Sequence, residues 1–289
     1  MCPVLDETAI SAAFAQPDND GTFAGAYGEY LHSLGARRPA IIFAFPPKAA
    51  GTFLRSAAIE AVNGQLVRIV HAQGGRDAQP YLPILLSYYL GGLSESTLVT
   101  HVHMQALPAN RRFLEAFDLR PVIMLRPIAD MLASYWDMLE SDQAARQDGL
   151  NCTIPEGFLE FSRERKANYL IDIFGPWYAG YFATWLEYAR EQPDRVCVLN
   201  YGEFLRDPTE TLSVALQHAG VPRSQDACRR AIEAVWNERG LHRFNRGTQG
   251  RGSSYFSWRH IDHLARMLDH YGIPASEFTY LLKTSSKPA

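Results

Sequence analysis

The sequence has few of the features that mark several large classes of protein. It holds only four cysteines, and no two of them are separated by two residues. Zinc sites built on thiolates need such close pairs, so we expect no metal centre of that kind. Scattered thiols also suit a reducing compartment. The longest apolar run, residues 81–93, is too short to span a bilayer and is interrupted by Pro83.

An excess of positive charge and a recognisable leader are missing as well. The formal net charge is −3 at pH 7, whereas proteins devoted to nucleic acid carry a surplus of basic residues. We therefore expect no nucleic-acid partner. The first residues have neither the basic nor the apolar segment of a secretory signal. These observations lead us to expect a cytoplasmic protein without a transmembrane segment. No feature of the sequence indicates its oligomeric state.

What the sequence does contain is typical of one globular unit. The chain has 289 residues, of which 47% are hydrophobic and 20% charged, values that fit a soluble domain. Residues 1–37 are mixed and polar, and we expect an N-terminal arm there. Residues 38–289 carry regular patterns, and we expect a single α/β domain over that range.

Short apolar runs alternate with helical patterns along this range. Continuous apolar runs predict buried strands at residues 40–45, 66–70, 97–102, 121–125 and 196–201. Helical periodicity is found at residues 52–63, 108–117, 130–140, 158–173, 177–191, 208–219, 225–238 and 257–271. This alternation predicts a central parallel sheet of about five strands flanked by helices. Ligands of such sheets lie beyond the carboxyl ends of the strands. The residues expected to meet there are those of the loop 46–52 together with His101, His103, Arg126 and Tyr201.

The first candidate anion site is the strand, loop and helix start at residues 45–54. Lys48 precedes Thr52 by four residues, and there is no Gly-Lys pair, so this is not a Walker A motif. A loop that opens a helix nevertheless aims backbone N–H groups and the positive helix end at an anion. On the residues alone, a P-loop-like phosphate-binding loop and a plain strand-to-helix turn are equally acceptable interpretations.

A second candidate combines Arg126, at the end of a strand, with Ser134, about two helical turns later. A guanidinium and a hydroxyl can hold a phosphate together. Taken alone, the pair is better explained by an Arg126–Asp130 ion pair and a serine facing a neighbouring helix.

The third candidate is the loop at residues 242–254, which contains three glycines and several donors. Residues 221–270 hold nine arginines against five acidic residues. Such local charge suits a small polyanion. A solvated basic loop is an equally good explanation.

Together these pieces resemble the PAPS-dependent sulfotransferases (PAPS is 3′-phosphoadenosine 5′-phosphosulfate), especially the cytosolic type. Residues 47–54 are similar to the family's P-K-S-G-T-T-W-L loop, residues 126–134 have its R-x7-S spacing, and residues 245–250 are similar to its R-K-G-x-x-G loop. Two further stretches also match. Residues 100–108 look like the T-H-L-P-x-x-x-L-P segment, and residues 201–208 look like the Y-E-D-x-x-x-D-P segment.

The resemblance implies a sulfotransferase that uses PAPS as co-substrate, without a metal, and that sulfates a hydroxyl of a small-molecule, sugar or lipid acceptor. It implies that Lys48 stabilises the leaving phosphate and that His101 is the general base. His103 points to the same face of the strand and could serve instead. The residues implied for cofactor binding are Lys48, Ala50, Gly51, Thr52, Phe53, Arg126, Ser134, Tyr201, Asn245, Arg246 and Gly247.

Several positions depart from the family pattern. Ala50 stands where the family has Gly, Gly51 where it has Thr, Phe53 where it has Trp, and Asn245 where it has Arg. These departures keep two other functions open, an ATP-dependent kinase of the same architecture and a nucleotide-binding pseudoenzyme.

Aromatic residues recur at helical spacing between residues 177 and 188. Core packing is the preferred interpretation of such a stripe. The alternative is an aromatic wall of the acceptor pocket.

Overall fold

The structure, a computed structural model, describes residues 39–70, 80–81, 84–85, 88–89, 96–141, 154–237 and 248–282. The expected N-terminal arm, residues 1–37, lies outside the described residues. The same holds for three predicted cofactor-binding residues, Asn245, Arg246 and Gly247.

A five-stranded sheet forms the centre of the molecule, and all of its strand pairs are parallel. The strand order is β2-β3-β1-β4-β5. The strands are β1 (Ala40–Phe43), β2 (Gln65–Leu66), β3 (Leu98–His101), β4 (Val122–Leu125) and β5 (Cys197–Asn200). Both β1 and β3 are buried along their whole length, as expected for apolar strands covered on both faces. The predicted fold class, a single α/β domain with a parallel sheet, is confirmed.

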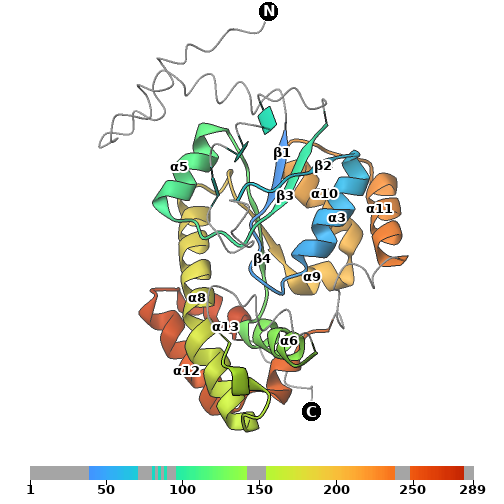
Figure 1. Ribbon diagram of the computed structural model, residues 1–289. Coiled ribbons are helices and arrows are strands. Elements are labelled where there is room, and N and C mark those ends of the chain that lie inside the picture. The colour runs from blue at the N-terminus through green and yellow to red at the C-terminus, as the bar shows by residue number, and fades with distance from the viewer. Residues whose placement is uncertain are drawn as a thin grey trace, which may run out of the picture.

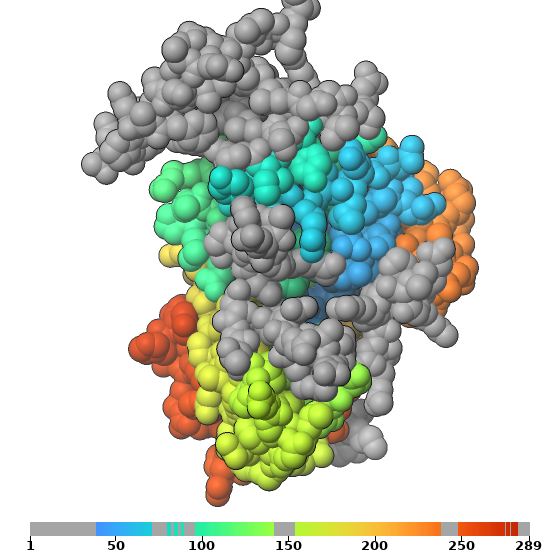
Figure 2. Space-filling view, in the orientation of Figure 1, coloured from blue at the N-terminus to red at the C-terminus, as the bar shows by residue number. Residues whose placement is uncertain are grey.

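Helices cover both sides of the sheet (Figure 1). They are α3 (Gly51–Val62), α5 (Pro108–Ala116), α6 (Ile128–Ser141), α8 (Arg163–Glu191), α9 (Tyr201–Arg206), α10 (Pro208–His218), α11 (Gln225–Asn237), α12 (Trp258–His270) and α13 (Ala275–Leu281), with short 3₁₀ turns η2 (Glu156–Phe158) and η3 (Arg251–Ser254). Figure 2 shows α3, in blue, and α11, in orange, side by side at the surface, where they pack on each other. At the other end of the molecule, α8 packs on α6 and α12.

The helix α8 corrects one prediction. Two helices were expected, at residues 158–173 and 177–191, but one helix of 29 residues runs through Pro176. Ser162 caps its N-terminus by accepting a hydrogen bond from the Arg165 N–H at 3.2 Å. An interior proline costs about 3 kcal/mol, and the long buried face of α8, with Phe174 and Tyr178 on either side of the proline, offsets this cost.

Each strand is also shorter than its predicted run, and for two of them hydrogen bonds explain where the strand ends. Residue Val67 donates the last backbone bond from β2 to β3, at 2.9 Å. Beyond it the chain turns to another partner, because Tyr81 donates to the Ile69 carbonyl at 2.6 Å. β2 is therefore shorter than the predicted strand 66–70.

The last strand ends one residue early for a different reason. The side chain of Asn200 accepts hydrogen bonds from the N–H groups of Gly202 at 2.8 Å and Glu203 at 3.3 Å. An asparagine in this position is a helix N-cap. Tyr201 therefore opens α9 instead of ending β5.

None of the helices in the described segments is both long and apolar enough to cross a membrane.

Candidate functional site

The candidate site lies where β1 and β3 end side by side. Phe43 of β1 pairs with His101 of β3 and with Val122 of β4. The loop that follows β1 therefore starts next to the last residue of β3. This is the edge at which ligands of open α/β sheets bind, and the sequence predicted that the loop and His101 would meet there.

The loop between β1 and α3 has an unusual backbone. Lys48 and Ala50 both take left-handed conformations, each with φ of 65°. Such a conformation costs roughly 1–2 kcal/mol for a residue other than glycine. Left-handed residues in a turn can gather successive N–H groups into a concave anion-binding nest. Ala50 is also the N-cap of α3, where it offers no side-chain acceptor, and the first turn of α3 carries no acidic residue. The loop thus presents a positive helix end to the site.

Surrounding side chains hold this strained loop in place through its carbonyl groups. Tyr178 of α8 donates to the Pro47 carbonyl at 3.1 Å, and Tyr181 donates to the Ala44 carbonyl. Arg126 donates from Nη1 to the carbonyl of Lys48. Backbone strain persists only where the surroundings over-determine it, and these three bonds supply that restraint.

Aromatic residues of α8 do the same for the segment after β3. Trp185 donates from Nε1 to the Met104 carbonyl at 2.9 Å. Tyr181, Trp185 and Tyr188 are all buried. Core packing is confirmed for these three positions, with the addition that the polar atoms of Tyr181 and Trp185 hold the two segments of the site.

The side chain of Lys48 extends toward α6. Its Nζ lies 3.5 Å from the Sδ of Met138. Ser134 is one helical turn before Met138, on the same face of α6, and it is buried. The loop lysine thus reaches the face of α6 that carries Ser134.

His101 lies directly against the loop. Its side chain is only 9% exposed, and a Cβ added to Gly51 would overlap the His101 ring. This close approach explains why glycine stands at position 51, where the sulfotransferase pattern has threonine. The ring of His103 is next to it, with the two centroids 5.0 Å apart. The two histidines are thus side by side, and the ring of His101 contacts the loop at Gly51.

Arg126 is buried beneath the loop, at 5% exposure. Its guanidinium lies 4.1 Å from the centre of the Tyr201 ring, and its Nε is buried without a hydrogen-bond partner among the described residues. Burial raises the pKa of the Tyr201 hydroxyl, and the Arg126 charge opposes part of that effect. A buried donor of this kind costs free energy unless a ligand accepts its hydrogen bond.

Asp130 does not serve as the partner that one interpretation gave to Arg126. Its two carboxylate oxygens accept hydrogen bonds from the N–H groups of Gly250 and Gly252, both at 2.8 Å. Gly252 lies so close to α6 that an added Cβ would be 2.5 Å from the Ala129 Cβ. The acid therefore fastens the C-terminal end of the glycine-rich segment to α6, a role that the sequence reasoning missed.

Phe53 is more deeply placed than expected for an adenine contact. It is buried, with its ring edge-on to Phe204 at 5.7 Å and to Trp236 at 5.8 Å. Trp236 of α11 is 40% exposed. The aromatic surface available next to the loop thus includes Trp236. The sequence did not single out Trp236, because this residue resembles any other apolar residue of an amphipathic helix.

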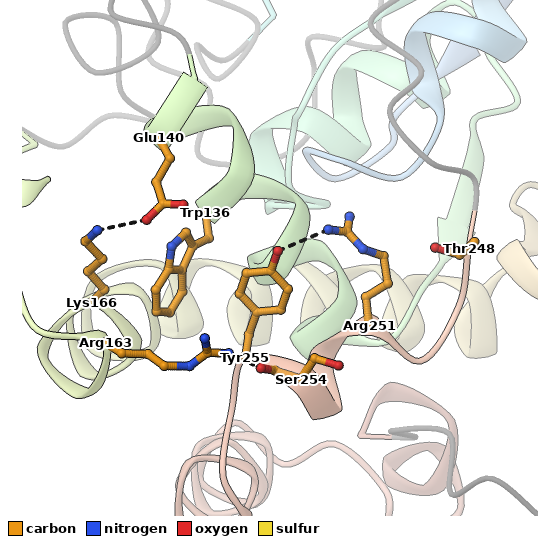
Figure 3. Close-up of a pocket in the computed structure, with 8 residues that line it drawn as sticks. All are labelled: Trp136, Glu140, Arg163, Lys166, Thr248, Arg251, Ser254 and Tyr255. Atoms are coloured by element: carbon orange, nitrogen blue, oxygen red, sulfur yellow. Dashed lines mark hydrogen bonds and ion pairs between the residues drawn. The ribbon is translucent and has the colours of Figure 1, made fainter.

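A groove of about 680 Å³ lies between α6, the start of α8 and η3 (Figure 3). Its charged side chains are already engaged. Lys166 pairs with Glu140 at 2.8 Å, and Arg251 pairs with Asp137. Arg163 donates to the Ser254 carbonyl. We conclude that Arg251 and Arg163 fasten η3 to α6 and α8, and thereby support the segment that Asp130 also holds.

No family model and no curated protein sequence matches the chain. Among solved structures, mouse sulfotransferase SULT7A1 complexed with PAP matches with a TM-score of 0.60 and 12% identity, over 89% of this chain and 93% of that one. Retinol dehydratase in complex with androsterone and the inactive cofactor PAP matches with a TM-score of 0.47 and 13% identity, over 85% of this chain and 84% of that one. The first match shows that the chain has the fold of the mouse sulfotransferase along most of its length.

Proposed function

We propose that the protein is a PAPS-dependent sulfotransferase that transfers a sulfuryl group to a hydroxyl of a small-molecule, sugar or lipid acceptor. One observation carries the proposal. The ring of His101 lies against Gly51, so a candidate general base touches a candidate anion-binding loop. A transferable anionic group on that loop would lie beside a group able to take a proton from the acceptor. The shared fold with a PAP-bound sulfotransferase supports the same function.

The residues at the site suit the chemistry of PAPS. The left-handed loop and the uncapped start of α3 suit its 5′-phosphosulfate. The buried Nε of Arg126 and the hydroxyl of Ser134 suit its 3′-phosphate. We assign Asn245, Arg246 and Gly247 to the same phosphate on the strength of the family resemblance. Tyr201 and the aromatic pair Phe53 and Trp236 are proposed to border the adenine.

PAPS would supply the sulfuryl group. The rest of the molecule would leave as adenosine 3′,5′-bisphosphate (PAP), which keeps the electron pair of the broken sulfur–oxygen bond. Lys48 is proposed to neutralise the charge that grows on the leaving phosphate. His101 is proposed to accept the proton of the acceptor hydroxyl as the new oxygen–sulfur bond forms. The loop and the buried rim would hold the two reactants in line, which is the main demand of such a transfer.

Arg126 provides the test of the 3′-phosphate assignment. Arg126→Ala is expected to weaken binding of the 3′,5′-bisphosphate about 10- to 100-fold, because hydrogen bonds to charged groups contribute this much. Binding of adenosine 5′-phosphate, which lacks the 3′-phosphate, is expected to change much less. Isothermal titration calorimetry measures both constants.

Two further variants control for changes in packing. Arg126→Gln keeps most of the volume next to Tyr201 and is expected to show the same selective loss. Arg266→Ala removes an exposed arginine of α12, whose side chain is 69% exposed, and is expected to bind both nucleotides as the unmodified protein does. Equal losses for both nucleotides in the Arg126 variants would contradict the assignment.

A further inference from the structure

A second, smaller cavity is lined in part by His101. It has a volume of about 90 Å³ and is formed by α3, the end of β2 and the end of β3. Its polar lining consists of Arg55, Arg68, Thr100 and His101. A cavity of this size has room for several water molecules or for one small oxyanion group.

Arg55 reaches this cavity from the helix that follows the loop. It lies one turn after Gly51 on the same face of α3, the face against which the ring of His101 packs. Its Nε is buried without a hydrogen-bond partner in the described part of the chain. Among the described residues, its guanidinium donates one long hydrogen bond, 3.5 Å from Nη2 to the Ser56 hydroxyl.

Arg55 is under the influence of another cation. Burial and the positive charge of Arg68 both lower the pKa of the Arg55 guanidinium. Within the described residues neither arginine has a carboxylate at ion-pair distance, although Arg111, Arg195 and Arg251 each do. Two cations that line one cavity repel each other, and burial adds a desolvation cost for Arg55, the more buried of the two. A bound anion would offset both costs.

The position of the cavity separates it from the proposed PAPS phosphates. It lies on the β2 and β3 side of the sheet, whereas Arg126 and Ser134 follow β4, on the far side of β1. His101 both contacts the loop at Gly51 and lines the cavity. An anion on Arg55 and Arg68 would therefore belong to the molecule that His101 deprotonates.

We propose that Arg55 and Arg68 form an anion-binding subsite for the acceptor, so that the acceptor carries a carboxylate, phosphate or sulfate group close to the hydroxyl that is sulfated. This inference rests on the proposed function. The planar fork of arginine suits all three oxyanions. The two arginines would select the acceptor and set its hydroxyl next to His101.

The test compares matched anionic and neutral hydroxyl compounds on the protein saturated with PAP. The pairs are 4-hydroxyphenylacetate and its methyl ester for a carboxylate, glucose 6-phosphate and glucose for a phosphate, and glucose 6-sulfate and glucose for a sulfate. Calorimetry is expected to show that at least one anionic member binds about 10-fold or more tightly than its neutral partner. The pair with the largest ratio identifies the anion.

Variants tie this preference to the two arginines. Arg55→Met and Arg68→Met are each expected to reduce it, and the double variant is expected to abolish it. Arg55→Lys, which keeps the positive charge but not the planar guanidinium group, is expected to retain part of the preference for the anionic compound. Arg266→Met, the matched change on α12, is expected to leave it intact. Because Arg55→Met removes a repulsion between like charges, the variant is expected to melt no earlier than the unmodified protein.

The outcomes separate this inference from the proposed function. If no anionic compound binds more tightly than its neutral partner, or if the preference survives in the double variant, the subsite is wrong. If the unmodified protein fails to bind PAP, the proposed function is wrong, and the anion preference is then measured without PAP. All four arginine variants at positions 55 and 68 are expected to bind PAP within a few-fold of the unmodified protein.

Discussion

Replacing His101 by alanine is expected to abolish sulfuryl transfer while the dissociation constant of PAP stays within a few-fold. A positioned general base typically contributes about 10²- to 10⁴-fold to a rate. His101 contacts the loop at Gly51, where the transferred group would lie, and therefore has the position of that base. The rate would be measured with PAPS and a panel of phenols, alcohols and sugars, including the anionic compounds above.

His103 supplies the matched control, because its ring is next to that of His101, while the atoms nearest to a Cβ on Gly51 all belong to His101. His103→Ala is expected to change the KM of the acceptor and to retain measurable kcat. His101→Gln, which fills part of the space of the ring, is expected to be as inactive as His101→Ala. An inactive His103→Ala beside an active His101→Ala would assign the base to His103. Full activity in both would place the base on another residue.

Lys48→Ala is expected to lower kcat about 10²- to 10³-fold, the usual cost of removing one group that stabilises charge in a transition state. The KM of PAPS is expected to rise much less, because the charge on the leaving phosphate grows only as the bond breaks. Steady-state kinetics with varied PAPS separates the two effects.

The backbone at position 48 makes this substitution a clean one. Lys48 has a φ of 65°, and alanine bears the same left-handed conformation at a similar cost, as Ala50 already does in the same loop. Lys48→Met keeps an apolar stem beside Met138 and is expected to behave like Lys48→Ala. A variant with near-normal kcat and only a raised KM would make Lys48 a binding residue without a role in the chemical step.

Much of the fold could be predicted from the sequence because its strands are buried on both faces. Runs such as residues 121–125 contain almost no polar side chain, and the strands formed there lie in the middle of the sheet. Parallel strands end at one edge, so the meeting of the loop with His101 and Arg126 followed from topology alone.

The failures arose where distant contacts decide the local structure. Pro176 signals a break, yet α8 continues because its packing on α6 and α12 outweighs one lost hydrogen bond. The turn of the chain after Val67 depends on a partner at Tyr81, fourteen residues away along the sequence. Asp130 looked like a natural partner of Arg126, but two glycine N–H groups from a loop 120 and 122 residues further on occupy its oxygens.

The central claim, that the site binds a 3′-phosphorylated adenine nucleotide, is tested most directly by the melting temperature of the unmodified protein with added nucleotides. PAP at 100 times its dissociation constant stabilises a folded protein by about 2.7 kcal/mol, and a rise of several degrees is expected. ATP with Mg²⁺ is expected to leave the melting temperature nearly unchanged, and adenosine 5′-phosphate to raise it less than PAP does. A shift with ATP and Mg²⁺ but none with PAP would contradict the account and favour a kinase of the same architecture, and no shift with any nucleotide would contradict it outright.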